Sequence, residues 1–352
     1  MYQSFEVTAR PEQGPPRLEA LRREIAGEGL DGFLVPRADA HQGEYVAAHD
    51  DRLAWLTGFT GSAGFCAALK DIAGVFIDGR YRTQVKAQVA PDFTPVPWPE
   101  VSLAEWLKDQ LPQGGKVGFD AWLHVPAQLE QLESALKGTG ISLVACDNLV
   151  DRIWHDQPAP PMNPAKVHQR EFAGESHDDK RDRLGQTLRD AGETAAVITL
   201  PDSLCWLLNI RGSDIPRNPI AQGFAVLHGS GVVDLFMAPA KLEGLAEHLG
   251  DKVTVHEPDK LLAYLDALPG PVRLDKGSVP VIVARAVGDR VSWGDDPCAL
   301  PKACKNAVEV EGARNAHRRA RVPAISGQQP AQYRTPMSCQ GVAGATVTDR
   351  LR

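Results

Sequence analysis

The sequence lacks the long apolar segment that a membrane-spanning helix requires. No run of about 18 apolar residues occurs along the chain. The N-terminal stretch MYQSFEVTARPEQGPP also lacks the basic start and apolar core of a secretory signal peptide. The sequence therefore predicts neither a membrane protein nor a secreted one, and we expect a cytoplasmic location.

Clustered cysteines and an excess of basic charge are absent as well. The six cysteines are far apart and form no Cys-x-x-Cys pair, so neither a disulfide framework nor a zinc site is indicated. Reduced and mostly buried thiols are expected instead. The formal net charge of −7 does not suit a nucleic-acid-binding protein, which normally presents a basic face. A hydrophobic content of 43% is typical of globular proteins, so disorder of the whole chain is not expected.

Familiar catalytic motifs are missing too. No G-x-S-x-G elbow and no H-E-x-x-H helix is present. Gly58, Gly61 and Gly64 are spaced unlike a phosphate-binding loop, and we interpret them as part of a tight turn. The ten histidines are scattered, and no acid-rich strand pair with a partnered histidine stands out. The motifs therefore assign no catalytic residue and no metal ligand, and they leave open a site that is assembled in three dimensions from residues far apart in the sequence.

Strands that alternate with helices are the main pattern of the sequence. In the first half, apolar runs predict strands at 33–35, 65–69, 75–77, 117–119 and 141–145, with helices from Pro16 and at 83–89, 103–111 and 127–136. In the second half, a charged helix at 175–190 precedes strands at 196–200, 224–227, 232–237, 253–256 and 272–274. This alternation predicts an α/β fold.

A motif of the form Asp-x-Leu-x-Trp-Leu, followed by Gly-Ser, occurs twice in the chain. Its copies begin at Asp51 and Asp202, 151 residues apart, and each follows a helix, a glycine and an apolar strand. Self-similarity over a long period indicates repeated structural units, so we predict that one α/β domain is duplicated. In each copy the aspartate is expected to cap a short helix.

Changes in composition mark the boundaries of the predicted domains. Residues 157–165 are rich in proline and are interpreted as a linker. Residues 318–352 contain six arginines, no lysine and one acid, and we expect them to be disordered. The remaining segments are predicted as a flexible arm over 1–15, a first domain over 16–156, a second domain over 166–304 and a helix over 305–317.

Three polar segments supply candidate functional residues. Asp39 and His41 follow the first strand, Arg80 and Tyr81 follow the strand at 75–77, and Arg211 and Asp214 lie in a polar loop. Because α/β proteins bind ligands in loops at the carboxyl ends of parallel strands, these six are candidates for the substrate side or for an interface. The structural alternative for the second segment is that Asp78 caps the next helix while Arg80 forms a salt bridge.

Four segments, taken in order, resemble one enzyme family. They are DAHQGEYVAAHDDRLAWLTGFTGSAG, DGRY, WLLNIRGSDIPRNP and KNAVEVEGARNAH, and they are similar to the cytosolic, three-domain type of aminopeptidase P, or Xaa-Pro aminopeptidase. The resemblance extends from about residue 18 to residue 317. It implies two tandem creatinase N-terminal-like domains, followed by a catalytic pita-bread domain that binds two manganese ions through two Asp, one His and two Glu.

The resemblance also implies an activity, which is metal-dependent removal of an N-terminal residue that precedes proline, commonly by a homodimer. Only the first helix of the catalytic domain is matched, at 305–317. We therefore expect a truncated chain that has no cofactor of its own and is inactive alone, with a frameshift as the hypothesis for residues 318–352. Two alternatives are a dimerisation or binding module that acts with a full-length partner, and a hydrolase that uses residues such as His41.

Overall fold

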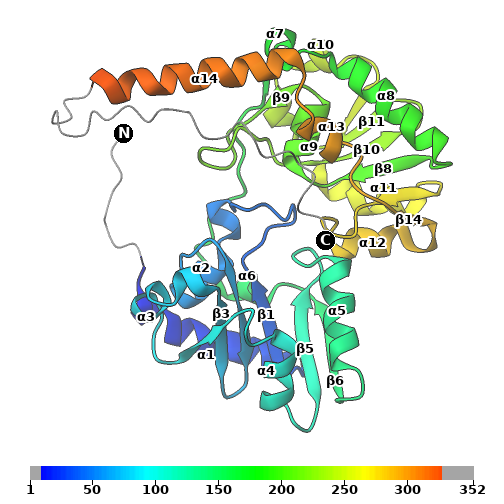
Figure 1. Cartoon of the computed structure of the whole chain (residues 1–352). Coiled ribbons are helices and arrows are strands. Elements are labelled where there is room, and N and C mark those ends of the chain that lie inside the picture. The colour runs from blue at the N-terminus through cyan, green and yellow to red at the C-terminus, as the bar shows by residue number, and fades with distance from the viewer. Residues whose placement is uncertain (1–8, 327–352) are drawn as a thin grey trace, which may run out of the picture. The chain divides into compact units, whose positions relative to one another are not determined.

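A computed structural model describes residues 9–326 of the chain (Figure 1). The chain divides into two units, Met1–Cys304 and Lys305–Arg352. The first unit contains both halves of the repeat, here called domain I and domain II, and the second contains helix α14 (Ala307–Ser326). Within residues 9–326 no helix is both long and apolar enough to cross a membrane.

Domain I is built on a mixed six-stranded sheet with the order β4-β3-β2-β1-β5-β6. Strand β2 runs antiparallel to both β1 and β3, and the other neighbouring strands are parallel. The strands are β1 (Gly32–Pro36), β2 (Gly64–Leu69), β3 (Ala73–Ile77), β4 (Phe93–Pro97), β5 (Gly115–Asp120) and β6 (Ile141–Cys146).

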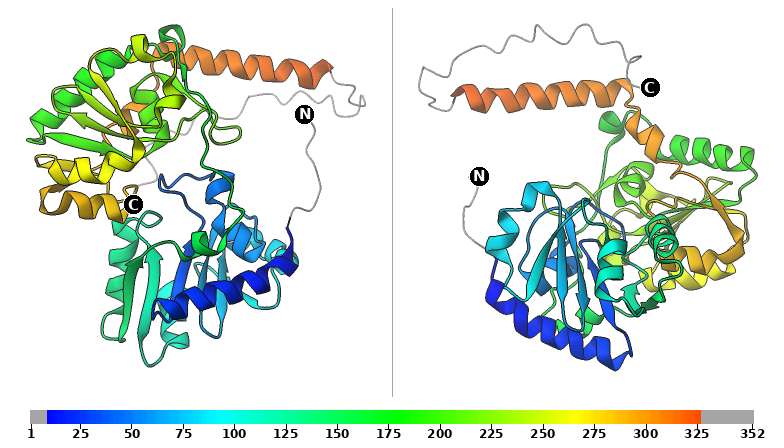
Figure 2. Two further views of the ribbon diagram at one scale, coloured as in Figure 1. Left: turned by 180° about the vertical axis from the view of Figure 1, so that it is seen from behind. Right: turned by 60° about the horizontal axis from the view of Figure 1, so that its bottom comes forward.

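Helices cover both faces of this sheet (Figures 1 and 2). They are α1 (Gly14–Gly27), α2 (Arg52–Thr57), α3 (Gln84–Gln88), α4 (Leu103–Gln110), α5 (Pro126–Leu136) and α6 (Leu149–Ile153). Side chains of a strand alternate between the faces, so Phe33 and Val35 pack with α1, α2 and α6. Leu34 lies between them and packs on the opposite face with α4 and α5.

Domain II repeats this architecture and adds helix α7 (Arg170–Ala173) and a short antiparallel pair of β7 (Lys166–Val167) with β9 (Ile210–Arg211). Its sheet has the order β12-β11-β10-β8-β13-β14. The strands are β8 (Ala195–Ile198), β10 (Phe224–His228), β11 (Val233–Phe236), β12 (Val253–His256), β13 (Val272–Leu274) and β14 (Val291–Trp293). The helices are α8 (His177–Asp190), α9 (Pro201–Leu207), α10 (Ala246–Leu249), α11 (Leu261–Ala267), α12 (Val281–Val287) and α13 (Ala299–Ala303).

The strand order of the two sheets confirms the predicted duplication. β1 of domain I and β8 of domain II occupy the same place, and each is flanked by one antiparallel and one parallel neighbour. The short helices α2 and α9, which carry the repeated motif, follow these strands in both copies.

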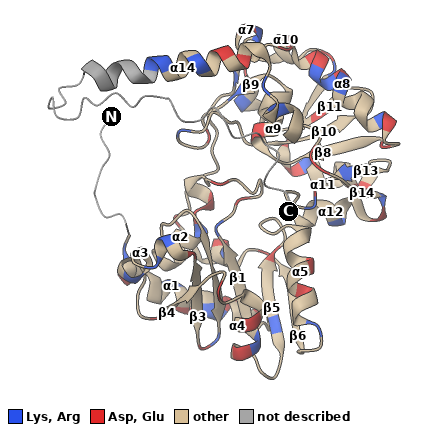
Figure 3. Cartoon of the chain, in the orientation of Figure 1, with Lys and Arg blue, Asp and Glu red and all other residues tan. Residues whose placement is uncertain are grey.

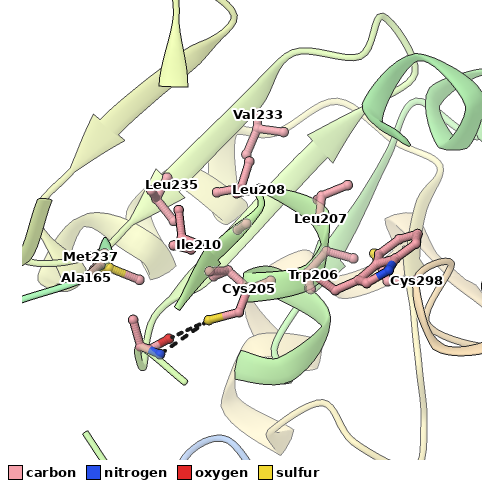
Figure 4. Close-up of a cluster of buried hydrophobic side chains, with 14 of the residues drawn as sticks. Ala165, Cys205, Trp206, Leu207, Leu208, Ile210, Val233, Leu235, Met237 and Cys298 are labelled. Carbon is pink, nitrogen blue, oxygen red and sulfur yellow. Dashed lines mark hydrogen bonds between the residues drawn. The ribbon is translucent and has the colours of Figure 1, made fainter. Parts of the chain in front are cut away.

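The core of domain II shows how the repeated motif is used (Figure 4). Leu208, Ile210, Val233 and Leu235 lie together, beside the helix that carries Cys205. The backbone N–H of Ala221 donates to the Cys205 sulfur over 3.2 Å. Full burial raises the pKa of this thiol to about 11, so it stays protonated and inert at neutral pH.

The predicted helix caps are wrong in both copies. Asp51 occupies the N-cap position of α2, but its side chain accepts no cap hydrogen bond. Asp202 lies inside α9, because Pro201 begins that helix one residue earlier and leaves Leu200 at the N-cap. The side chain of Asp202 forms an ion pair with Lys302 instead.

The predicted limits of both ends also need correction. The arm expected over residues 1–15 is helical at its end, because a 3₁₀ turn at Pro11–Gln13 leads into α1 at Gly14. The tail expected to be disordered from residue 318 is helical up to Ser326 in α14, and residues 327–352 lie outside the described residues.

Charged side chains are rare on the strands and gather on the helices, such as α8 (Figure 3).

Candidate functional site at the interface of the two domains

The two domains differ most in the connections between equivalent elements. Residues 37–51 connect β1 to α2 in domain I, whereas residues 199–200 suffice to connect β8 to α9 in domain II. Conversely, residues 208–223 connect α9 to β10, where residues 58–63 suffice in domain I. Each domain therefore carries one long connection that the other lacks, and we call these the first insertion (37–51) and the second insertion (208–223).

The first insertion packs into domain II. Ala47 is buried within the core cluster of domain II, beside the side chains of α9. His41 is 8% exposed, and its Nδ1 donates to the carbonyl oxygen of Thr199 over 3.0 Å. The same ring stacks on Phe224 with 4.4 Å between centroids. His41 therefore joins the domains and has the contacts of a structural residue.

Asp39 connects the two insertions directly. One carboxylate oxygen accepts the backbone N–H groups of His41 at 3.0 Å and Gly43 at 3.1 Å, which fixes the turn of the first insertion. The other oxygen accepts the side-chain amide of Gln222, in the second insertion, at 2.8 Å. Burial of this carboxylate is tolerated because each oxygen has a hydrogen-bond donor.

Asp214 holds the second insertion through a buried ion pair. The Lys241 ammonium lies 2.5 Å from Asp214 Oδ2, and the two side chains are 4% and 0% exposed. The same ammonium donates to the carbonyl oxygen of Gln222 at 2.8 Å, and the Gln222 N–H donates to Asp214 at 2.6 Å. Asp39, Gln222, Asp214 and Lys241 thus form one continuous polar network, which we call the seam.

A second contact between the domains lies beside the seam. The N–H groups of Val281 and Ile282, at the start of α12, donate to the carbonyl oxygens of His124 at 2.9 Å and Ala121 at 3.1 Å. Lys276 also forms an ion pair with Glu130 at 2.5 Å. Backbone hydrogen bonds and a shared core residue fix the two domains as one body at this point, because Val281 packs in the core cluster of domain I.

The other three candidate residues are not members of the seam. Arg80 is exposed and forms an ion pair with Asp78 at 2.6 Å, while Asp78 accepts the Arg80 N–H at 2.9 Å, which confirms the structural interpretation of that segment. The hydrogen bonds from Arg80 hold the pKa of the Asp78 carboxyl below its usual value. Tyr81 lies 2.5 Å from the Ser62 hydroxyl, and Arg211 pairs in β9 with Lys166.

Sequence reasoning missed an equivalent pair of polar residues beside the second contact. Asp120 accepts the Asn148 amide at 2.9 Å in domain I, and in domain II Asp275 accepts the Asp296 N–H at 3.1 Å. A signal was present, because Asp followed by Val-Pro occurs as Asp120 with Val125-Pro126 and again as Asp275 with Val279-Pro280. The different spacing within the two copies hides this second repeat.

The described residues do not fit a metal centre. Between residues 9 and 326, no group of three or more His, Cys, Asp or Glu side chains is placed to hold a metal ion. The closest gathering is Asp234, whose two oxygens accept hydrogen bonds from His256 Nε2 at 2.6 Å and His228 Nε2 at 2.8 Å. Those nitrogens carry the protons of the hydrogen bonds, so their lone pairs are not presented to a cation. We therefore derive no metal-dependent step from this chain.

Comparison with known proteins identifies both domains. Models of the creatinase/prolidase N-terminal domain match residues 17–153 and residues 156–309. The "Probable Xaa-Pro aminopeptidase P" of Coccidioides posadasii is 36% identical over 331 residues, which cover 89% of this chain and 51% of that protein. "Aminopeptidase P1" of Arabidopsis thaliana is 32% identical over 85% of this chain and 52% of its own length.

A solved structure supports the same relationship. X-prolyl aminopeptidase of Caenorhabditis elegans, described as a cytosolic enzyme with a di-nuclear active site, superimposes with a TM-score of 0.80 at 29% identity. The match covers 86% of this chain and 53% of that enzyme. The chain thus spans about half the length of the relatives that it matches. It belongs to the creatinase/prolidase N-terminal domain family, as two tandem copies homologous to the N-terminal part of Xaa-Pro aminopeptidase P.

Proposed function

We propose that these residues form the non-catalytic, two-domain support of a Xaa-Pro aminopeptidase, located in the cytoplasm, and that the 352-residue chain alone does not cleave peptides. The observation that supports this proposal is the alignment of both creatinase-like domains with the N-terminal half of aminopeptidase P relatives. Hydrogen bonds of the seam and of the second contact join the two domains into one body. Such a body suits the task of positioning a catalytic domain.

The chemistry of peptide hydrolysis explains why the support is expected to be inactive. A two-metal peptidase ionises a bound water and stabilises the developing charge with its two ions. Residues 9–326 offer no gathering of carboxylates and histidines that fits such a pair. In the proposed full-length enzyme, two manganese ions would be bound by residues other than those described here.

The proposal is tested with the purified 352-residue chain and the tripeptide Arg-Pro-Pro. We expect no release of arginine in the presence of Mn²⁺, and no stoichiometric Mn²⁺ binding by isothermal titration calorimetry. The full-length C. elegans enzyme serves as the positive control under the same conditions. Turnover of the tripeptide by this chain, abolished by a chelator, would show that the proposal is wrong.

A further inference from the structure

Domain I contains a cavity that the proposed function does not use. It has a volume of about 550 Å³ and lies over the carboxyl end of β1, between α4 and α5. Its walls are mainly apolar, and include Leu34, Phe65, Leu129 and Leu132. A volume of this size falls within the range of small-molecule sites, which run from about 300 to 1,000 Å³.

The charged groups of the cavity are of one sign, and its other polar side chains, Gln42, Ser102, His124, Gln128 and Gln131, are uncharged or titratable. Arg37 is the one charged side chain among the described residues that line it, and no carboxylate is among them. The Arg37 guanidinium donates to the carbonyl oxygen of Glu44, which holds the side chain in place. An apolar enclosure with a single fixed cation is complementary to a ligand that has an apolar body and one negative charge.

His124 adds a hydrogen-bond acceptor to the same cavity. The side chain is 8% exposed, and its Nδ1 donates to the carbonyl oxygen of Asp120 at 3.0 Å. Burial lowers the pKa of the imidazole, so the ring is neutral at physiological pH. A neutral ring that carries its proton on Nδ1 keeps a lone pair on Nε2. The edge-on contact with Phe119, at 5.3 Å between centroids, fixes the ring orientation.

We propose that this cavity binds a short apolar peptide with a free C-terminal carboxylate, whose carboxylate pairs with Arg37 and whose backbone N–H donates to His124. The apolar side chains of the peptide would occupy the walls formed by Phe65, Leu129 and Leu132. This site lies within domain I and needs no metal ion. It is therefore independent of the proposed function, and either proposal can fail without the other.

The test compares two ligands that differ only in charge, N-acetyl-Leu-Phe and its C-terminal amide, by isothermal titration calorimetry with the full chain. We expect the carboxylate to bind about tenfold more tightly than the amide, since a charge-assisted hydrogen bond at a partly exposed site contributes about this factor. In Arg37→Gln the two ligands should bind equally. Lys108→Gln removes a cation from the exposed side of α4 and should retain the tenfold preference.

A second variant tests the walls of the cavity without changing its charge. Leu132→Trp fills the space beside α5, and should weaken both the carboxylate and the amide by at least about tenfold. Unchanged far-ultraviolet circular dichroism and unfolding midpoint would show that the variant is folded. Failure of both ligands to bind the natural chain at millimolar concentration, or equal binding of the two, would overturn the proposal.

Discussion

Domains I and II build the same sheet but fill one equivalent position with opposite chemistry. The strand pairs Phe65–Phe76 and Phe224–Phe236 occupy the same register, which makes Gly74 and Asp234 equivalent. In domain I a carbon added at Gly74 would lie 2.9 Å from the ring of Trp106 in α4. In domain II the helix residue is Tyr264, whose hydroxyl donates to Asp234 at 2.6 Å.

The comparison of Gly74 with Asp234 shows that the fold keeps the aromatic residue of the covering helix and lets the strand residue beneath it vary. Both helix residues contact, edge-on, the phenylalanine that lies two residues further along the strand. The ring centroids are 5.5 Å apart for Trp106 and Phe76 and 5.2 Å apart for Tyr264 and Phe236. The aromatic contact is therefore kept, while the strand residue beneath it changes from glycine to a hydrogen-bonded carboxylate. An aspartate beneath an indole would lack the hydroxyl donor that Tyr264 supplies, although His228 and His256 also donate to Asp234.

The two insertions are also held differently, because Asp39 of the first accepts neutral hydrogen-bond donors whereas Asp214 of the second forms a buried ion pair. The first insertion relies on Ala47 and His41, whereas the second depends on the buried pair of Asp214 and Lys241. Removal of one member of a buried ion pair leaves an uncompensated charge. The largest expected effects on stability should therefore come from the second insertion.

Replacing the seam lysine is predicted to have the largest effect. Lys241→Met leaves the Asp214 carboxylate buried without its cation, and should lower the free energy of unfolding by about 3–5 kcal/mol. Urea unfolding followed by circular dichroism measures this change. The pair of changes Lys241→Met with Asp214→Leu should recover much of the loss, because no charge then remains buried.

A matched surface pair provides the control for that measurement. Lys252 forms an ion pair with Asp182, and the side chains are 50% and 56% exposed. Lys252→Met should cost less than about 1 kcal/mol, because solvent screens exposed pairs. Equal losses from the two lysine variants would contradict the special role assigned to the seam.

A charge placed at the first insertion is predicted to separate the domains. Ala47→Asp puts a carboxylate into the core cluster of domain II without a partner, at a cost of about 3 kcal/mol. Docking of the insertion should be lost before either domain unfolds, so differential scanning calorimetry should show two transitions in place of one. The exposed Ala87→Asp in α3 should leave the thermogram unchanged. A single transition for Ala47→Asp would indicate that the second contact holds the domains together alone.

A smaller effect is predicted where the two domains differ beneath the aromatic residue. Gly74→Ala introduces a methyl group 2.9 Å from Trp106, and such overpacking should destabilise the chain by about 1–3 kcal/mol. Trp106→Leu in the same background should reduce the penalty, because the ring no longer opposes the methyl group. Urea unfolding of the four members of this cycle measures the coupling, and additive losses would show that the contact is not responsible.

The sequence allowed much of the fold to be predicted. Apolar runs located ten of the strands, such as 65–69 and 224–227, because buried strands leave a contiguous signal. β4 was missed, since Pro95 and Pro97 disguise it, and prolines of this kind are tolerated only because β4 lies at the sheet edge. β14 was missed because it lies at a sheet edge and has no fully buried residue, so it leaves no apolar run.

The candidate site was predictable in its residues but not in its arrangement. Asp39, His41 and Asp214 were identified as polar groups in loops, and the structure brings them to the interface of the domains. Their true partners, Gln222 and Lys241, have no local pattern that distinguishes them from surface residues. Pairing across two insertions depends on how the domains pack, and a single sequence does not encode that contact in any spacing.

The two copies also differ at the polar pair beside the second contact, and the difference concerns protonation. Asn148 in domain I and Asp296 in domain II each accept the N–H two residues onward, from Val150 and Cys298. The amide of Asn148 donates to Asp120, but a carboxylate at 296 has no proton to donate to Asp275. Burial, followed by the charge of Asp275, raises the pKa of Asp296 above its ordinary value.

Placing at position 296 the amide that domain I has at Asn148 is predicted to have the smallest effect, with a size that depends on pH. A carboxyl whose pKa is raised by folding gives its full stabilisation below the unfolded value, near pH 4, and loses it as the pH rises through the folded value. Asp296→Asn should therefore match the natural chain near pH 4 and exceed its stability at pH 8, by about 1 kcal/mol. Urea midpoints measured across this range test the difference. Asn148→Asp in domain I should show the opposite trend, so a stability gap for Asp296→Asn that is constant with pH would mean that Asp296 keeps an ordinary pKa despite its burial.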